Sequence, residues 1–115
     1  MAFKMSSEVS GHVVSMALVG ELDATSAGVF KSEVDKALGQ APRSLVLEVK
    51  DLTFMASAGL RVLIYAKQKL GAGVSLYVVA PQEAILSTLR MTGFDKSVYI
   101  VDQRPPVESD AGRPA

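Results

Sequence analysis

The feature that most constrains the fold is a succession of strand, helix and strand in the middle of the chain. An apolar run at residues 45–49 is followed by a helix-like segment at residues 57–70, and a second apolar run lies at residues 74–79. Short, nearly continuous apolar runs are typical of buried strands in a parallel sheet. Parallel neighbours need a crossover connection, which the helical segment supplies. The sequence therefore predicts an α/β fold whose sheet is parallel at its centre.

The segments before this unit predict a hairpin and a first helix. Residues 3–10 alternate apolar and polar side chains, a turn follows, and residues 13–19 form a second apolar run, as expected for two antiparallel strands. Phe30, Val34 and Leu38 then recur at four-residue spacing, which indicates an amphipathic helix. Asp23 and Thr25 are both candidates for its N-cap.

The segments after the central unit predict one more helix and one more strand. Pro81 suits the first position of a helix, Gly93 suits its end, and residues 97–101 suit a short strand. The predicted order is β-β-α-β-α-β-α-β, a mixed sheet with a parallel centre and helices packed against it. The remaining residues, 103–115, are rich in proline and polar side chains, and we expect a disordered C-terminal tail.

The amino-acid composition argues against several classes of function. The chain has 115 residues, which suits a single domain, and its 12 basic residues balance its 12 acidic residues. Such a balance argues against a dedicated nucleic-acid surface. The absence of cysteine excludes thiolate chemistry and cysteine-ligated zinc. No apolar run is long enough for a membrane span, so a cytoplasmic location is expected.

Ser57 is the residue of greatest interest because it lies where the central strand gives way to a helix. A serine there can cap the unpaired N–H groups of the first turn. A phosphate on the same hydroxyl would instead add about −1.5 to −2 charges at a helix start that favours anions. Helix position alone leaves both interpretations open.

Enzymatic alternatives have little support. The single histidine, His12, lies in a predicted turn far from Ser57 in the sequence, and no G-x-S-x-G or phosphate-loop motif is present. Asp51 follows a buried strand, as a phosphorylated aspartate of a receiver domain would, but Glu21 and Asp23 do not complete a metal-binding cluster there. We expect Asp51 to be a turn residue and the protein to need no cofactor.

Three motifs together resemble one known family. Residues 20–23 read GELD, residues 52–60 read LTFMASAGL, and residues 91–94 read MTGF. In this order and spacing they resemble the STAS domain (sulfate transporter and anti-sigma factor antagonist), most closely the single-domain bacterial anti-sigma factor antagonists. The resemblance implies a STAS domain over residues 1–102 and a function in binding rather than catalysis.

The resemblance also implies partner switching. Such proteins bind an anti-sigma factor, usually a serine kinase of the GHKL type, and thereby release a sigma factor. The kinase phosphorylates one serine at the start of the second helix, which weakens the complex, and a PP2C-like serine phosphatase restores it. Ser57 falls on that phosphoacceptor position. The implied partner-binding residues are Asp23, Thr53, Met55, Ala56, Ala58, Gly59, Leu60, Arg61 and Ile64.

Two residues depart from the pattern of the family. Many relatives have an acidic residue immediately before the phosphoacceptor and a second hydroxyl residue immediately after it, whereas this chain has Ala56 and Ala58. Asp23 matches an acidic position near the serine and is a candidate substitute. The alternative is a constitutive STAS interaction subunit of a signalling or lipid-transport complex, in which Ser57 is only a helix cap.

Overall fold

A five-stranded sheet and three α-helices make up the part of the chain that the structure describes. The computed structural model describes residues 2–103. The elements, in chain order, are β1 (Lys4–Ser10), β2 (Val13–Leu22), α1 (Ala27–Leu38), β3 (Ser44–Met55), α2 (Ser57–Leu70), β4 (Ser75–Val79), α3 (Glu83–Met91), a 3₁₀ turn η1 (Phe94–Lys96) and β5 (Tyr99–Val101). This order agrees with the predicted one, including the antiparallel hairpin and the parallel centre.

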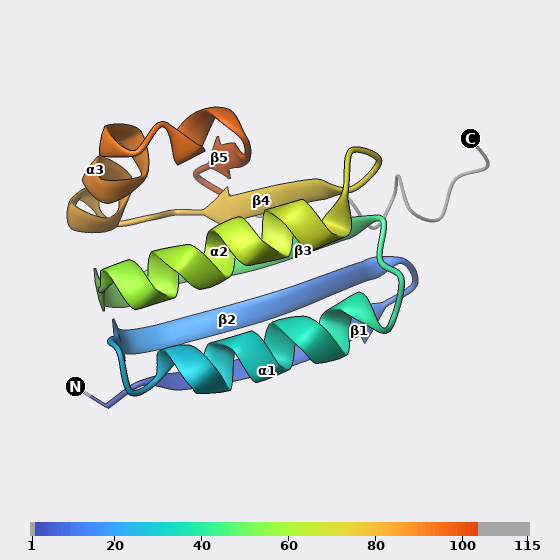
Figure 1. The fold of residues 1–115 in the computed structure, drawn as a ribbon, viewed down its shortest axis with the longest axis horizontal. Helices are drawn as coiled ribbons and strands as arrows, with labels where there is room; N and C mark the ends of the chain where they lie inside the picture. The colour runs from blue at the N-terminus through green and yellow to red at the C-terminus, as the bar shows by residue number, and fades with distance from the viewer. Residues whose placement is uncertain (1, 104–115) are drawn as a thin grey trace.

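The strand order explains why the helices share one side of the sheet. The strands lie in the order β1-β2-β3-β4-β5, so each crossover from β2 onward moves one place in the same direction. Crossovers between parallel strands are right-handed, and successive crossovers in one direction place their helices on the same face. Figure 1 shows α1 and α2 side by side over the sheet, with α3 beyond them near β4 and β5. The opposite face carries no helix of the described chain.

The core lies between the helices and the sheet. Phe30 and Val34 of α1 have no exposed surface, which confirms the helical face predicted from their spacing, and Leu89 of α3 is equally buried. Phe94, just after the left-handed Gly93, is also buried against this core. The buried strand residues that face the helices are Val14, Met16, Leu18, Leu22, Leu45, Leu47, Val49, Leu52, Met55, Leu76 and Val78.

Two strands are longer than predicted. β2 continues through Leu22 rather than ending at residue 19, and β3 continues through Met55 rather than ending at residue 49. Asp51 is therefore not a turn residue: it lies within β3, opposite Val19 of β2. The polar residues at these strand ends face solvent, and apolar periodicity does not detect strand residues of this kind.

Two of the predicted helix starts are wrong. The N-cap of α1 is Ser26, not Asp23 or Thr25. The third helix begins at Glu83 after an extended N-cap, Gln82, so Pro81 is not its first residue. Asp, Ser, Thr and Pro all favour helix starts, so their presence near a start does not decide which residue occupies the cap.

The predicted disordered tail falls almost entirely on residues 104–115, which lie outside the described residues. Among residues 2–103, no helix is both long enough and apolar enough to cross a membrane.

Candidate functional site

The candidate site lies where β3 extends past its neighbour and turns into α2. β4 pairs only with residues 44–48 of β3, whereas β2 accompanies β3 as far as Met55. The last residues of β3 therefore have a strand neighbour on one side only. The side chains of Thr53 and Phe54 are exposed in this segment, at the end of the sheet where α2 begins.

An irregularity in the β2–β3 pairing sets the direction of these side chains. Gly20 lies opposite Leu52 and Glu21 opposite Phe54, so Thr53 is an extra residue on β3. The Thr53 hydroxyl donates a 3.1 Å hydrogen bond to the carbonyl oxygen of Gly20, which fastens this bulge to β2. Bulges bend a strand and re-aim its side chains, and they are common beside functional sites.

α2 begins without any side-chain cap. Ala56 occupies the N-cap position with an extended backbone (φ −75°, ψ 166°), and Ser57 is the first helical residue. The Ala56 N–H donates a 2.8 Å bond to the carbonyl oxygen of Leu22, and the Ala56 carbonyl accepts from Gly59 and Leu60. The predicted helix-cap role of Ser57 is therefore wrong, because Ala56 takes the N-cap position and Ser57 is the first residue of the helix.

The Ser57 side chain lies at the surface of the first turn of α2. It is exposed, and among the described residues its hydroxyl has no hydrogen-bond partner. The first turn of α2 also contains no acidic residue. The N-terminal end of a helix carries partial positive charge and favours a nearby anion. A phosphate attached to Ser57 would therefore not be repelled by a carboxylate on this turn, and no side chain of the turn would block it.

Gly59 brings α2 close to the end of β2. A Cβ atom at this position would lie 2.7 Å from both Cγ and Cδ2 of Leu22 and 3.2 Å from Cγ of Met55. Leu22 is fully buried in a close-packed core, so a shift of its side chain would be unfavourable. Only glycine allows this approach, so packing against the core, rather than capping, holds the first turn of α2 in place.

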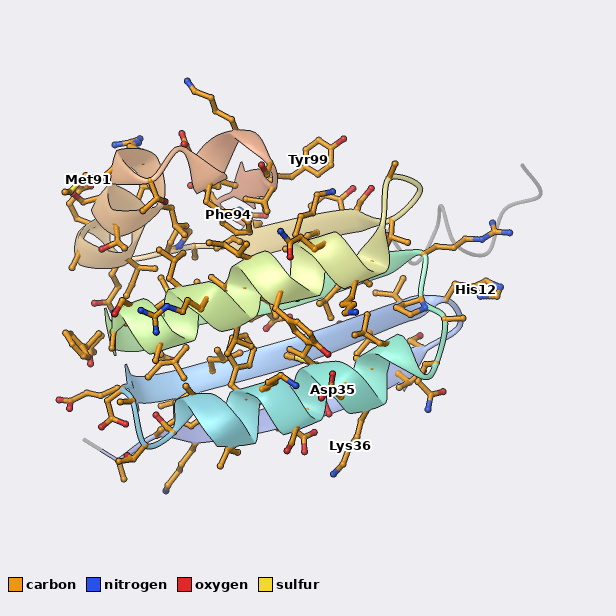
Figure 2. The ribbon with its side chains drawn as sticks, in the orientation of Figure 1. His12, Asp35, Lys36, Met91, Phe94 and Tyr99 are labelled. Atoms are coloured by element: carbon orange, nitrogen blue, oxygen red, sulfur yellow. The ribbon has the colours of Figure 1, made fainter. Side chains whose placement is uncertain are left out.

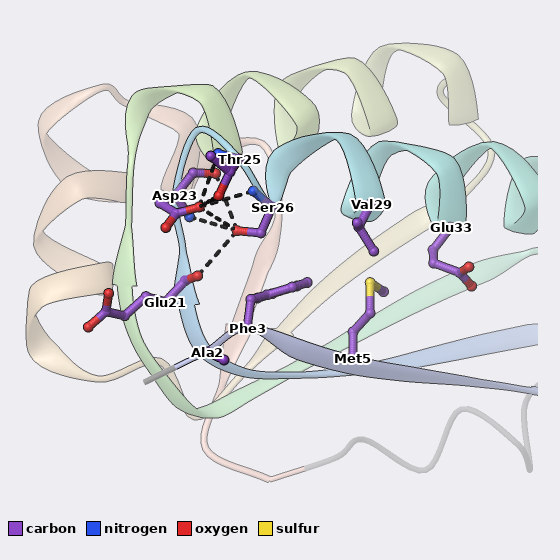
Figure 3. Close-up of a pocket in the computed structure, with 9 residues that line it drawn as sticks. All are labelled: Ala2, Phe3, Met5, Glu21, Asp23, Thr25, Ser26, Val29 and Glu33. Carbon is purple, nitrogen blue, oxygen red and sulfur yellow. Dashed lines mark hydrogen bonds between the residues drawn. The ribbon is translucent and has the colours of Figure 1, made fainter.

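Asp23 lies directly after Leu22 and organises its own loop. Its Oδ1 accepts hydrogen bonds of 2.7–3.0 Å from the N–H and hydroxyl groups of both Thr25 and Ser26. Figure 3 shows this network at the start of α1. The Thr25 hydroxyl, followed by the Ser26 N–H and hydroxyl, lowers the pKa of Asp23 below its ordinary value. The carboxylate is thus occupied within residues 23–26, and no bond from it to Ser57 is formed.

The predicted partner-binding residues fall into three groups by exposure. Exposed residues are Thr53 and Arg61; half-buried residues are Asp23, Ala56, Ala58 and Ile64; buried residues are Met55, Gly59 and Leu60. The buried three belong to the core beneath the surface, so a direct contact is expected only from the other six. The arrangement gives a surface around Ser57 with small side chains on both sides, and Arg61 lies exposed one turn further along α2.

Phe54 lies within the stretch from Thr53 to Ala56 that was predicted to contact a partner, and it is exposed where strand alternation would bury it. Its side chain is 49% exposed beside the start of α2. Alternation from the buried Leu52 would turn Phe54 toward the core, but the extra residue at Thr53 reverses this pattern and buries Met55 instead. The sequence did contain a signal for this reversal: the apolar residues Leu52 and Met55 are three positions apart, which breaks the two-residue alternation of a strand.

The single histidine of the sequence, His12, lies far from Ser57. His12 precedes β2 and Ser57 lies beside its last residue, so the ten-residue strand separates them by about 30 Å. Figure 2 shows His12 at the hairpin end of the sheet. Among the described residues, no three His, Cys, Asp or Glu side chains are grouped so that they could hold a metal ion. The geometry suits a modifiable binding surface.

Comparisons with known proteins agree with this architecture. The family model of the STAS domain matches residues 4–109. Anti-sigma-F factor antagonist RsfB of Mycobacterium tuberculosis is 26% identical over 85 residues, 74% of this chain and 70% of that protein. The crystal structure of an anti-sigma factor antagonist from Mycobacterium paratuberculosis superposes with a TM-score of 0.80 at 25% identity, covering 96% of this chain and 91% of that one. The Bacillus cell fate determinant SpoIIAA, in its phosphorylated form, shares the fold at 21% identity with a TM-score of 0.72, covering 97% and 100% of the two chains.

Proposed function

We propose that this chain, which belongs to the STAS domain family, is an anti-sigma factor antagonist whose binding is switched off by phosphorylation of Ser57. The observation that carries the proposal is the Ser57 hydroxyl, exposed on the first turn of α2 and without a hydrogen-bond partner among the described residues. The names of its relatives, RsfB and the Mycobacterium paratuberculosis protein, support the antagonist function. The proposed location is the cytoplasm, where a sigma factor acts.

The surface around Ser57 explains how a phosphate would act. Phe54 supplies an exposed apolar side chain, Ala56 and Ala58 allow close approach, and Ile64 adds a half-buried apolar side chain. A partner that covers this surface removes the Ser57 hydroxyl from water. A phosphate there adds about −1.5 to −2 charges, and burying those charges in an apolar contact is unfavourable. Phosphorylation therefore weakens the complex, and removal of the phosphate restores it.

The proposed partners follow from this switch. The anti-sigma factor is a GHKL-type serine kinase that binds the surface and phosphorylates Ser57, and a PP2C-like serine phosphatase reverses the modification. Ala56 offers no carboxylate beside the hydroxyl, and the Asp23 carboxylate is already bonded to Thr25 and Ser26. We therefore assign Asp23 to shaping the loop beside the surface, and the base for the reaction to the kinase.

The test is phosphorylation in a purified system. The protein is mixed with a candidate anti-sigma kinase and ATP, and intact mass spectrometry counts added phosphates in wild type, Ser57→Ala and Ser32→Ala, the last a control at another exposed helical serine. The proposal expects one phosphate in wild type and in Ser32→Ala, and none in Ser57→Ala. Tight binding of the kinase without any phosphate would indicate constitutive antagonism and would exclude the switch.

A further inference from the structure

The first strand leaves a long edge of the sheet without a neighbour. β1 has seven residues, its pairing with β2 runs from Lys4 to Ser10 without a register shift, and it contains no proline. Figure 1 shows β1 along one edge of the sheet and β5 at the other. β5 has three residues and offers little to pair with. Proteins usually protect long edges with proline, bulges, short strands or charged side chains, because open edges recruit another strand, and of these devices β1 has only the charges of Lys4 and Glu8.

The turn of the hairpin identifies which backbone groups of β1 point outward. Ser10 and Val13 flank a two-residue turn, and the pair that closes such a turn exchanges hydrogen bonds. Bonded and non-bonded pairs then alternate along an antiparallel ladder. The even-numbered residues of β1 therefore bond to β2, while the N–H and C=O groups of Met5, Ser7 and Val9 face the open edge. These groups are available to a second antiparallel strand.

The charges on β1 are complementary to a second copy of the same strand. In an antiparallel pair centred on Ser6, Lys4 of each copy lies opposite Glu8 of the other. Both side chains are exposed, and neither takes part in an ion pair among the described residues. Centring on Lys4 or Glu8 would instead place like charges opposite each other, which is unfavourable. The register centred on Ser6 also makes Met5, Ser7 and Val9 the bonding residues, as the open edge requires.

Apolar side chains on the helix-facing side of β1 fit the same register. Val9, which is 53% exposed, would lie opposite Phe3 of the second copy. Phe3 and Met5 line an open groove between β1 and α1, together with Val29, which is 54% exposed. Figure 3 shows Phe3, Met5 and Val29 in this groove. Pairing would bring Val9 of the second copy to the Phe3 end of the groove.

We propose that β1 is a dimerisation edge at which two copies pair antiparallel about Ser6 and join their sheets. The contact is isologous and uses the only long edge of each described sheet, so it closes at two copies rather than growing into a fibre. β2 and α1 separate this edge from α2. The dimer therefore leaves the surface around Ser57 available, and it does not depend on the proposed switch.

Charge reversal tests the register. Lys4→Glu gives a strand with two acidic residues, and Glu8→Lys gives one with two basic residues, so each variant alone opposes like charges. We expect the dimer dissociation constant, measured by sedimentation equilibrium, to rise about tenfold or more for each single variant. An equimolar mixture of the two, and the double variant Lys4→Glu/Glu8→Lys, should recover dimers. Circular dichroism shows that each variant is folded.

A backbone variant tests the edge independently of charge. Ser7→Pro removes an N–H that faces the open edge and leaves the ladder to β2 complete, so it should give a folded monomer. Wild-type protein that remains monomeric at about 1 mM would overturn the proposal. Dimers that withstand both Ser7→Pro and the single charge reversals would also overturn it, because they would have to form elsewhere.

Discussion

The starts of α1 and α2 lie at the same end of the sheet, yet they are held in different ways. At α1, the Asp23 carboxylate and the hydroxyls of Thr25 and Ser26 bind one another and the local N–H groups. At α2, the N-cap is Ala56, no side chain caps the helix, and Gly59 packs against Leu22. Neither N-cap side chain bonds to the first turn of its helix, but polar side chains close the loop before α1, whereas packing against the core holds the start of α2. That difference leaves the Ser57 hydroxyl exposed and unbonded.

The largest effect is expected from alanine substitutions at two glycines, one in the first turn of each helix, which test how tightly the two helix starts are packed. Gly59→Ala places a methyl group 2.7 Å from the buried Leu22 and should lower the free energy of unfolding by about 1–3 kcal/mol. Gly28, in the first turn of α1, has no atom within 4 Å of an added Cβ. Gly28→Ala should therefore raise the same free energy, by up to about 1 kcal/mol. Urea denaturation measures both, and equal effects would mean that the two starts are packed alike.

Restoring a cap at α2 should have a smaller effect. Ala56 already has the extended backbone that an N-cap residue needs, so Ala56→Ser supplies an acceptor for the N–H groups of the first turn. We expect the free energy of unfolding to rise by about 1 kcal/mol. Ala58→Ser, inside the first turn, is the control and should give no such gain. Failure of Ala56→Ser to stabilise the protein would indicate that the start of α2 is already satisfied.

The smallest expected effect is the acid dependence of the α1 start. Hydrogen bonds from Thr25 and Ser26 hold the pKa of Asp23 below its ordinary value of 3.8. The ionised carboxylate therefore stabilises the fold above that pH, and this contribution is lost as the pH falls through the lowered pKa. Between neutral and acidic pH, the melting temperature should fall less for Asp23→Asn than for wild type, as thermal unfolding at several pH values would measure.

Some acid dependence should remain in Asp23→Asn. The Tyr65 hydroxyl, 2.5 Å from Asp35, and then Lys31 lower the pKa of Asp35, which links α1 to α2. The melting temperature of the double variant Asp23→Asn/Asp35→Asn should therefore depend less on pH than that of either single variant. Identical pH profiles for wild type and Asp23→Asn would show that the loop bonds do not depend on the charge of Asp23.

The sequence predicted the fold well where apolar spacing carries the information. The order of elements and the bounds of α2 follow from runs of buried side chains, and the motifs at residues 20–23, 52–60 and 91–94 led to the family that the match over residues 4–109 confirms. Apolar spacing does not predict the end of a strand correctly where exposed polar residues continue it. Asp51 lies in β3 for this reason, although it was expected in a turn.

The details of the site were harder to predict because they depend on contacts between β2 and the β3–α2 junction. Ser57 was correctly placed at a helix start, but capping preferences favour serine over alanine and did not reveal that Ala56 takes the cap. The exposure of Phe54 depends on the extra residue at Thr53, which is defined only by the register with β2. The roles of Ser57 and its neighbours in binding remain predictions.

The most direct test of the central claim compares one partner's affinity for two forms of this protein. Unmodified protein and protein carrying a single phosphate on Ser57 are each titrated into the purified anti-sigma factor by isothermal calorimetry. The open start of α2 predicts that the unmodified form binds and that the phosphorylated form binds at least about tenfold more weakly, because the added charge is buried in the contact. Equal affinities for the two forms would contradict the account.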